Sequence, residues 1–271
     1  GPELVRVMNL IMGLGGVAPI VAPLIGATIQ RVWHWRGAFW LVALLGVVMT
    51  VGALLTIRES LPPERRHTGG LRAFADAAKV AIGRRRYVGY VLMAAFGNIG
   101  VFAYVATSSF VLQTMKGMSV TTYGIMFAVN ASGLTLGTLT SARLAGGIST
   151  RRVILGGLLV ALGAAGAVLI GAVAFGTPLP LLLVGFFLYI TAQGFIGANV
   201  GALAVTEMKD YAGTGSALLG LVASVAAAVG APLAGLGGTG TAVPMALMMT
   251  LGSAFALVCL VVVAGPAPQP T

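Results

Sequence analysis

Charged side chains are scarce in this 271-residue sequence. Only 8% of the residues are Asp, Glu, Lys or Arg, whereas 58% are hydrophobic, and the mean hydropathy is +1.00. A soluble domain carries about 25% charged residues, because water has to wet its surface. The composition therefore excludes a soluble globular fold and indicates that lipid surrounds most of the chain.

Residues that hold metals or carry out catalysis are equally few. The single cysteine, Cys259, excludes a disulfide framework and a cysteine metal site. The two histidines, His34 and His67, fall in expected loops on opposite sides of the membrane, so they cannot form a metal pair. An integral-membrane transferase generally needs an Asp-rich cluster or a histidine near the interface, and the expected inner loops offer neither in usable form. We therefore expect no cofactor, no metal site and no enzymatic activity.

The sequence is dominated by long runs without charge. A membrane-spanning helix needs about 20 apolar residues. The runs 153–206 and 211–271 are each long enough for two helices, and Gly and Pro residues at 176–180 and 237–244 divide them. The runs also lack the period-two alternation of a membrane barrel. The sequence therefore predicts an all-α membrane protein with eight transmembrane helices. They are expected near residues 7–30, 38–57, 87–113, 119–142, 153–175, 179–205, 211–236 and 242–264.

The net charge of +10 would suit nucleic-acid binding, but its distribution follows membrane topology. With eight helices in place, 13 of the 16 Lys and Arg residues fall on one side, and only Arg31, Arg36 and Lys116 fall on the other. Cytoplasmic loops are enriched in Lys and Arg. We therefore expect a multi-pass protein of the inner or plasma membrane, with the lipid bilayer as its partner and no nucleic acid. The loop 58–86 and both ends of this chain are expected in the cytoplasm.

The loop 58–86 is the only sizeable soluble segment. Apolar residues recur at helical spacing between Leu71 and Ile82, which predicts a short amphipathic helix on the inner membrane surface. The arginines 84–86 follow, and we expect them to anchor on anionic lipid headgroups. The loop separates two expected helices in residues 1–57 from six in residues 87–271.

Several motifs occur in one order along the chain. The first is APIVAPLIG at 18–26, whose two prolines bend a helix and leave a groove for a neighbour. It resembles the antiporter motif in the fifth helix of major facilitator drug exporters, in the AP-x-x-AP-x-x-G form of the Bcr/CflA branch. WRGAFW at 35–40 and ESLP at 59–62 are similar to the start and the exit of that branch's sixth helix.

The later motifs continue this resemblance in the same order. FAYVATSSFVLQ at 102–113, GMS at 117–119 and FAVNA at 127–131 resemble the family's seventh and eighth helices, with Ser109 where proline is expected. AGTGSALLG at 212–220 resembles the start of its eleventh helix. Each motif alone is weak evidence for the family, because membrane helices have repetitive sequences. Together, however, the motifs occur in the family's order and spacing over nearly the whole chain.

The resemblance implies a major facilitator superfamily helical bundle, whose two halves rock around a midplane cavity. Residues 1–57 would be the last two helices of the N-terminal half, 58–86 the central loop and 87–271 the six-helix C-terminal half. The family's first four helices would then be missing. The implied function is multidrug efflux, in which amphipathic drugs or xenobiotics leave in exchange for protons. A proton relay needs an ionisable group at depth. None of the six acidic residues lies mid-span, so we expect this C-terminal portion not to couple protons by itself.

The candidates for a substrate cavity are amide and aromatic residues deep in the spans. Asn98 and Phe102 share one helix face with Val105 and Ser109, and the family's seventh helix lines its cavity. An amide in lipid needs a partner, so each amide has an alternative role as a hydrogen bond between helices. The candidates are Asn98, Phe102, Asn130, Gln193 and Asn199.

Two further sets follow from the resemblance. The antiporter-motif residues would bend their helix so that the two halves can seal, and a passive kink is the alternative. They are Ala18, Pro19, Ala22, Pro23 and Gly26. Three arginines lie where the family has its second cytoplasmic gate loop, and simple anchoring explains them equally well. They are Arg143, Arg151 and Arg152.

Two alternatives to drug export stay open, namely export of a small metabolite and a membrane scaffold that does not transport. An apolar cavity with a few amides favours amphipathic substrates over sugars, which need many hydrogen-bonding side chains.

Overall fold

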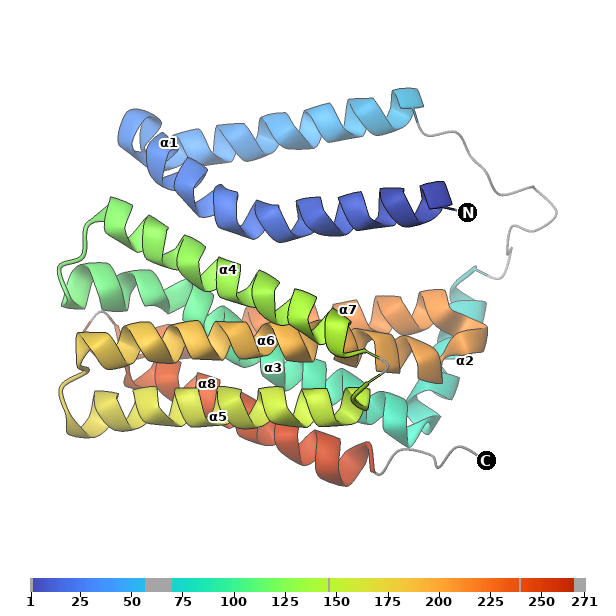
Figure 1. Cartoon of the computed structure of the whole chain (residues 1–271). Coiled ribbons are helices and arrows are strands. Elements are labelled where there is room, and N and C mark those ends of the chain that lie inside the picture. The colour runs from blue at the N-terminus through green and yellow to red at the C-terminus, as the bar shows by residue number, and fades with distance from the viewer. Residues whose placement is uncertain (1, 57–69, 146, 239, 266–271) are drawn as a thin grey trace.

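The computed structural model describes residues 2–56, 70–145, 147–238 and 240–265, and these form an all-helical bundle (Figure 1). The segment 57–69, with the ESLP motif and His67, lies outside the described residues. The α-helices are α1 (Pro2–Thr56), α2 (Gly70–Gly83), α3 (Arg85–Ser109), α4 (Val120–Leu144), α5 (Thr150–Ala174), α6 (Leu179–Glu207), α7 (Ala212–Gly235) and α8 (Val243–Val258). Three short elements continue or join them: the π-helix η2 (Phe110–Met115), the 3₁₀ helix η3 (Lys209–Tyr211) and the π-helix η4 (Cys259–Val263).

Seven helices in the described part of the chain are long and apolar enough to cross a membrane. They match seven of the eight expected spans. The remaining expected span, 7–30, coincides with the first arm of α1 and stays a prediction. In the central loop, α2 lies where the apolar spacing predicts a helix, and it buries Ala77 and Ala81 while packing on α3 and α7.

α1 folds back on itself as a helical hairpin (Figure 1). The sequence places a loop near residues 31–36, and the structure confines the non-helical backbone inside α1 to His34, at φ 55° and ψ −170°. The Arg36 guanidinium lies 4.4 Å from the centre of the Trp35 ring. Aromatic side chains with a polar group suit the membrane–water interface, so the residues of this bend mark one end of the bundle.

The expected breaker sequences do form the turns between the last four spans. Gly176 and Thr177 have positive φ between α5 and α6, and Gly238 has positive φ between α7 and α8. Pro180 and Pro244 follow within the first turns of α6 and α8, where a missing backbone N–H costs nothing because it would have no helical partner.

Glycine sets how closely the helices approach. A Cβ atom added at Gly230 of α7 would lie 2.8 Å from the carbonyl oxygen of Ile99, and one at Gly252 of α8 would lie 2.5 Å from that of Phe96. α3 therefore touches both neighbours backbone to backbone. Small residues permit such contact where no hydrophobic effect drives helices together.

Arginines join helices at one end of the bundle, hereafter the arginine end, which carries Arg84, Arg85, Arg143, Arg151 and Arg152. Arg85 donates to the carbonyl of Val262 at 2.8 Å, and Arg151 donates to the carbonyls of Leu260, at 2.8 Å, and Gly265. Arg84 donates to the carbonyl of Glu207 and lies 3.6 Å from Asp210. The carbonyls at a helix C-terminus carry the negative end of the helix dipole, so Arg84 and Arg85 bind protein where the sequence suggests lipid headgroups.

Candidate functional site

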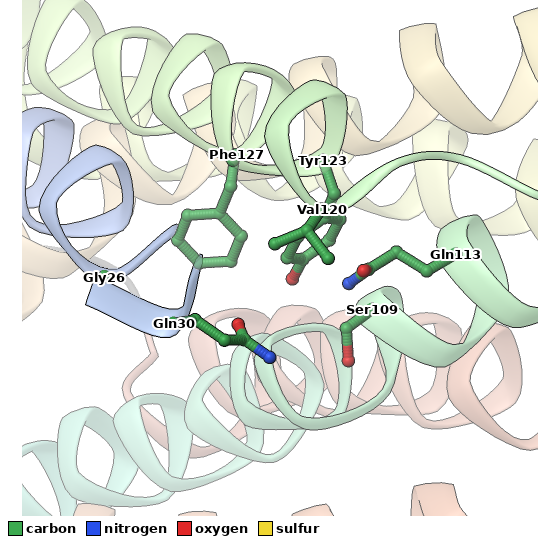
Figure 2. A pocket seen from close by; sticks show the side chains of 8 residues that line it. Gly26, Gln30, Ser109, Gln113, Val120, Tyr123 and Phe127 are labelled. Carbon is green, nitrogen blue, oxygen red and sulfur yellow. The ribbon is translucent and has the colours of Figure 1, made fainter. Parts of the chain in front are cut away.

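One cavity lies at the end of the bundle opposite the arginines, between α1 and the α3–α4 region, with a volume of about 460 Å³. We call it the amide cavity (Figure 2). Gln30 comes from α1, one turn before the bend at His34, and Gln113 comes from η2. Its lining residues are Gly26, Gln30, Ser109, Gln113, Val120, Tyr123, Gly124 and Phe127.

The amide cavity combines aromatic walls with neutral polar groups. Figure 2 shows Gln30 and Gln113 extending toward the same space from opposite sides. An amide offers two donors and an acceptor, and the described lining residues include no charged side chain. The volume lies within the range of about 300–1,000 Å³ typical of small-molecule pockets. The arrangement suits a neutral or weakly polar, largely apolar ligand.

A buried hydrogen-bond network supports the aromatic wall. Asn130, 2% exposed, donates from Nδ2 to the Tyr104 hydroxyl at 2.7 Å and so joins α4 to α3. The Tyr104 ring stacks on Phe127 at a centroid distance of 5.8 Å. The Tyr123 hydroxyl lies 3.1 Å from the Ser108 hydroxyl. Asn130 therefore lies behind the cavity, and it fixes the ring against which Phe127 packs.

A second cavity, hereafter the inner cavity, lies between α3, α6 and α7 and has a volume of about 380 Å³. Both Asn98 and Gln193 line it. Asn98 donates from Nδ2 to the Ala94 carbonyl of its own helix at 2.9 Å, which leaves its side-chain oxygen for another donor. Ser216, in the first turns of α7, adds a hydroxyl. The inner cavity thus brings together two of the five cavity candidates, closer to the arginine end.

The other candidates lie elsewhere. Phe102 is 42% exposed and lines neither the amide cavity nor the inner cavity. Asn199 donates from Nδ2 to the Ser141 hydroxyl at 2.5 Å and to the Phe195 carbonyl at 2.7 Å, so it joins α6 to α4. Asn199 thus has the geometry of a hydrogen bond between helices, the alternative role noted for these amides.

The antiporter-motif segment belongs to the first arm of α1, which packs along α4 (Figure 1). Gly26 lines the amide cavity, and Ala22 is exposed. For Ala18, Pro19 and Pro23 the structure describes the helical backbone alone. One residue of the motif therefore reaches a cavity at the contact between α1 and α4.

The three gate-loop arginines differ in their contacts and exposure. Arg151 binds the carbonyls at the end of η4, as described above, whereas Arg143 and Arg152 are exposed. Neither Arg143 nor Arg152 forms a hydrogen bond or ion pair with a residue that the structure describes. Arg152 lies at the edge of an apolar groove.

Gln30, Gln113 and Tyr123 are not among the candidates expected from the sequence. The amides among those candidates lie near the middle of the spans, whereas both glutamines lie near span ends, where water can hydrate an amide. A usable signal was present: consecutive expected spans alternate in direction, so 7–30 and 87–113 run the same way, and the glutamines at their C-terminal ends fall at the same membrane level. The π-helical turn that directs Gln113 has no comparable signal in the sequence.

Seven helices that are long and apolar enough to cross a membrane, with two cavities between helices whose described lining residues are uncharged, are typical of a polytopic membrane transporter. The sequence profile of the Major Facilitator Superfamily matches residues 1–231, and the chain belongs to this family of transporters.

Three relatives illustrate the similarity. The chain is 30% identical to the uncharacterized MFS-type transporter YdgK of Bacillus subtilis (strain 168) over 251 residues, which are 92% of the chain and 62% of that protein. It is 25% identical to a bicyclomycin resistance protein homolog of Haemophilus influenzae over 93% of the chain and 62% of the relative. It is also 25% identical to the multidrug transporter MdfA of Edwardsiella piscicida over 80% of the chain and 53% of the relative. The chain thus spans less than two thirds of the length of these relatives.

Proposed function

We propose that this chain contributes to multidrug efflux of the Bcr/CflA type, in which amphipathic drug-like compounds are exported in exchange for protons. The names of two relatives, a bicyclomycin resistance protein homolog and a multidrug transporter, support this proposal. So do the motifs of α1, α3 and α7. The proposed location is the bacterial plasma membrane, with the arginine end and both ends of this chain in the cytoplasm.

The amide cavity is the observation that carries the proposal. In the proposed division, α1 supplies the last two helices of the N-terminal half, 58–86 is the central loop, and 87–271 is the C-terminal half. The amide cavity then lies at the contact between the halves, where rocking would change its access. Its aromatic walls and neutral amides suit amphipathic compounds, and its position at the contact makes it part of the substrate path.

Proton coupling needs a carboxylate within the spans. The sequence has six acidic residues, of which Asp76 pairs with Lys79 within α2, and Asp210 pairs with Arg84 near the ends of helices. None of the six lies mid-span in the expected topology. We therefore propose that this chain, expressed alone, inserts into membranes but does not export drugs against a proton gradient.

The test is ethidium accumulation in bacteria that lack their own efflux pumps. The chain is expressed alone, and also together with the part of the Bacillus subtilis relative that it does not match. The proposal expects ordinary accumulation with the chain alone and lowered, protonophore-sensitive accumulation with the pair. Gradient-sensitive efflux by the chain alone would contradict the coupling argument, and unchanged accumulation in both strains would contradict drug efflux.

Two variants then test the amide cavity. Gln113→Leu removes one amide and should weaken efflux by the two co-expressed polypeptides about fivefold, because one hydrogen bond is worth about 1 kcal/mol. Thr140→Val is the control, since Thr140 is an exposed polar residue of α4 outside the cavity. Equal efflux by both variants would remove the amide cavity from the substrate path.

A further inference from the structure

Both α4 and α5 pack along α6 (Figure 1). A third depression, hereafter the apolar groove, is lined by residues of these three helices. Its volume is about 330 Å³. Apolar side chains of all three helices line it, among them Leu144, Val160, Leu188 and Phe195. Val160 and Leu188 are 48% and 42% exposed, so the groove is open to the surroundings of the bundle.

Glycine makes the groove deep on the α5 side. Gly156 is exposed, and a Cβ atom added there would meet nothing within 4 Å. The adjacent Gly157 is buried instead, and a Cβ atom there would lie 3.0 Å from the Ile196 side chain. One glycine thus brings α5 close to α6, and the other leaves an open strip along the wall.

A positive charge lies at one end of the groove. Arg152 is its only charged lining residue among those the structure describes. The guanidinium of the neighbouring Arg151 is held by the carbonyls of Leu260 and Gly265, whereas Arg152 has no described protein partner. Arg143, on the last turn of α4, adds a second exposed cation near the same loop.

The length of the groove fits one leaflet of a bilayer. Arg152 and Val160 are eight residues apart on α5, which corresponds to about 12 Å at 1.5 Å per residue. Half of a hydrocarbon core of about 30 Å is about 15 Å. A lipid with its headgroup at Arg152 could therefore lay an acyl chain along the groove to near the bilayer midplane.

We propose that the apolar groove binds one anionic phospholipid of the leaflet at the arginine end. Arg152 binds the phosphate, with Arg143 adding positive potential, and one acyl chain lies along the strip at Gly156. The free arginine selects an anionic headgroup, because basic pockets between transmembrane helices attract such lipids. This site needs no transport cycle, so it stands independently of the proposed function.

The test is native mass spectrometry of the purified chain, with palmitoyl-oleoyl phosphatidylglycerol added in one series and palmitoyl-oleoyl phosphatidylcholine in another. The wild-type chain should retain one phosphatidylglycerol in preference to phosphatidylcholine. Arg152→Gln should lower the preference for phosphatidylglycerol about fivefold, which corresponds to the contribution of one arginine to binding at an anionic membrane surface. Arg152→Lys should keep most of it, because the charge remains.

Two matched controls separate the groove from the bilayer at large. Gly156→Leu fills the strip and should lower retained phosphatidylglycerol at least fivefold. Gly163→Leu, two helical turns further on the same face and equally free of neighbours within 4 Å, should retain the lipid. Lys209→Gln removes an exposed charge at the same end, outside the groove, and should leave the preference unchanged.

Three outcomes would overturn the proposal. The first is equal retention of both lipids by the wild-type chain, and the second is equal retention by Gly156→Leu and Gly163→Leu. The third is a dimer that the groove variants dissociate, because a second copy of the chain would then occupy the groove. Circular dichroism and gel filtration establish that each variant is folded, and the Arg152→Lys result keeps the headgroup claim testable if Gly156→Leu does not fold.

Discussion

The crossing of α6 over α4 at Gly194 allows a quantitative prediction. A Cβ atom at Gly194 would lie 2.7 Å from the backbone nitrogen of Thr138 and 3.1 Å from the backbone carbon of Gly137, with the carbonyl oxygen of Leu134 closer still. All three are backbone atoms, so no side-chain rotation relieves the clash. Gly194→Ala therefore forces the two helices apart until these contacts approach the ordinary 3.4–4 Å.

Gly197→Ala is the matched control. Gly197 lies three residues further on α6, and a Cβ atom there meets nothing within 4 Å. Both substitutions gain the same helix propensity, about 1 kcal/mol for Ala over Gly, so this gain cancels in the comparison. The remaining difference is the overpacking cost, about 1–3 kcal/mol. We expect the free energy of unfolding to be lower for Gly194→Ala than for Gly197→Ala by this amount.

The assay is equilibrium unfolding by SDS titration in mixed micelles, followed by circular dichroism. The tryptophans lie in α1, far along the chain from this crossing, so helical ellipticity is the better signal. If the two variants unfold with free energies within about 0.5 kcal/mol of each other, near the limit for a surface substitution, the close approach of α4 and α6 is refuted.

Three further predictions concern hydrogen bonds and topology. In a double-mutant cycle, Asn130→Ala and Tyr104→Phe should show a coupling energy between about 0.6 kcal/mol, the average for hydrogen bonds between membrane helices, and about 1.7 kcal/mol, the largest value. Additive effects would refute the bond. Arg151→Gln should lower the free energy of unfolding in lipid-free detergent by about 1.5–3 kcal/mol, because it removes charged hydrogen bonds to two helix-end carbonyls. Arg152→Gln should not lower it, and equal losses for the two variants would contradict the stabilising role of Arg151. Reporter fusions at Glu64 and Thr177 should report opposite sides of the membrane, and the same side for both would exclude the eight-helix topology.

Most of the helical architecture could be predicted from the distribution of charged residues along the sequence. Bilayer spans must be apolar and must satisfy their own backbone, so charge-free runs and the breakers at 176–180 and 237–244 were enough to predict seven of the helices now seen. The bend of α1 at His34 was placed to within a few residues. That a single residue, His34, makes the bend was not predictable, because a positive φ is uncommon for any residue with a side chain, although histidine adopts it more often than most.

The candidate site was less predictable, because amides look alike in sequence. Asn98 and Gln193 line a cavity, whereas Asn130 and Asn199 bind hydroxyl groups on neighbouring helices. The difference depends on which face meets which helix, and that depends on the glycine contacts between distant segments. Local helical spacing carries no information about those contacts.

The arginine contacts at the end of η4 have a consequence for biogenesis. Arg85 comes from the first helix of the six-helix set and Arg151 from the third, yet both hold carbonyls in the segment from Leu260 to Gly265. During synthesis these two guanidinium groups reach the membrane long before the segment that they bind. The last span therefore closes the six-helix set by docking onto two groups already in place, and until it leaves the ribosome the earlier helices carry unmatched positive charge. We expect a released chain truncated before Leu260 to be degraded by membrane proteases faster than one that ends beyond Gly265.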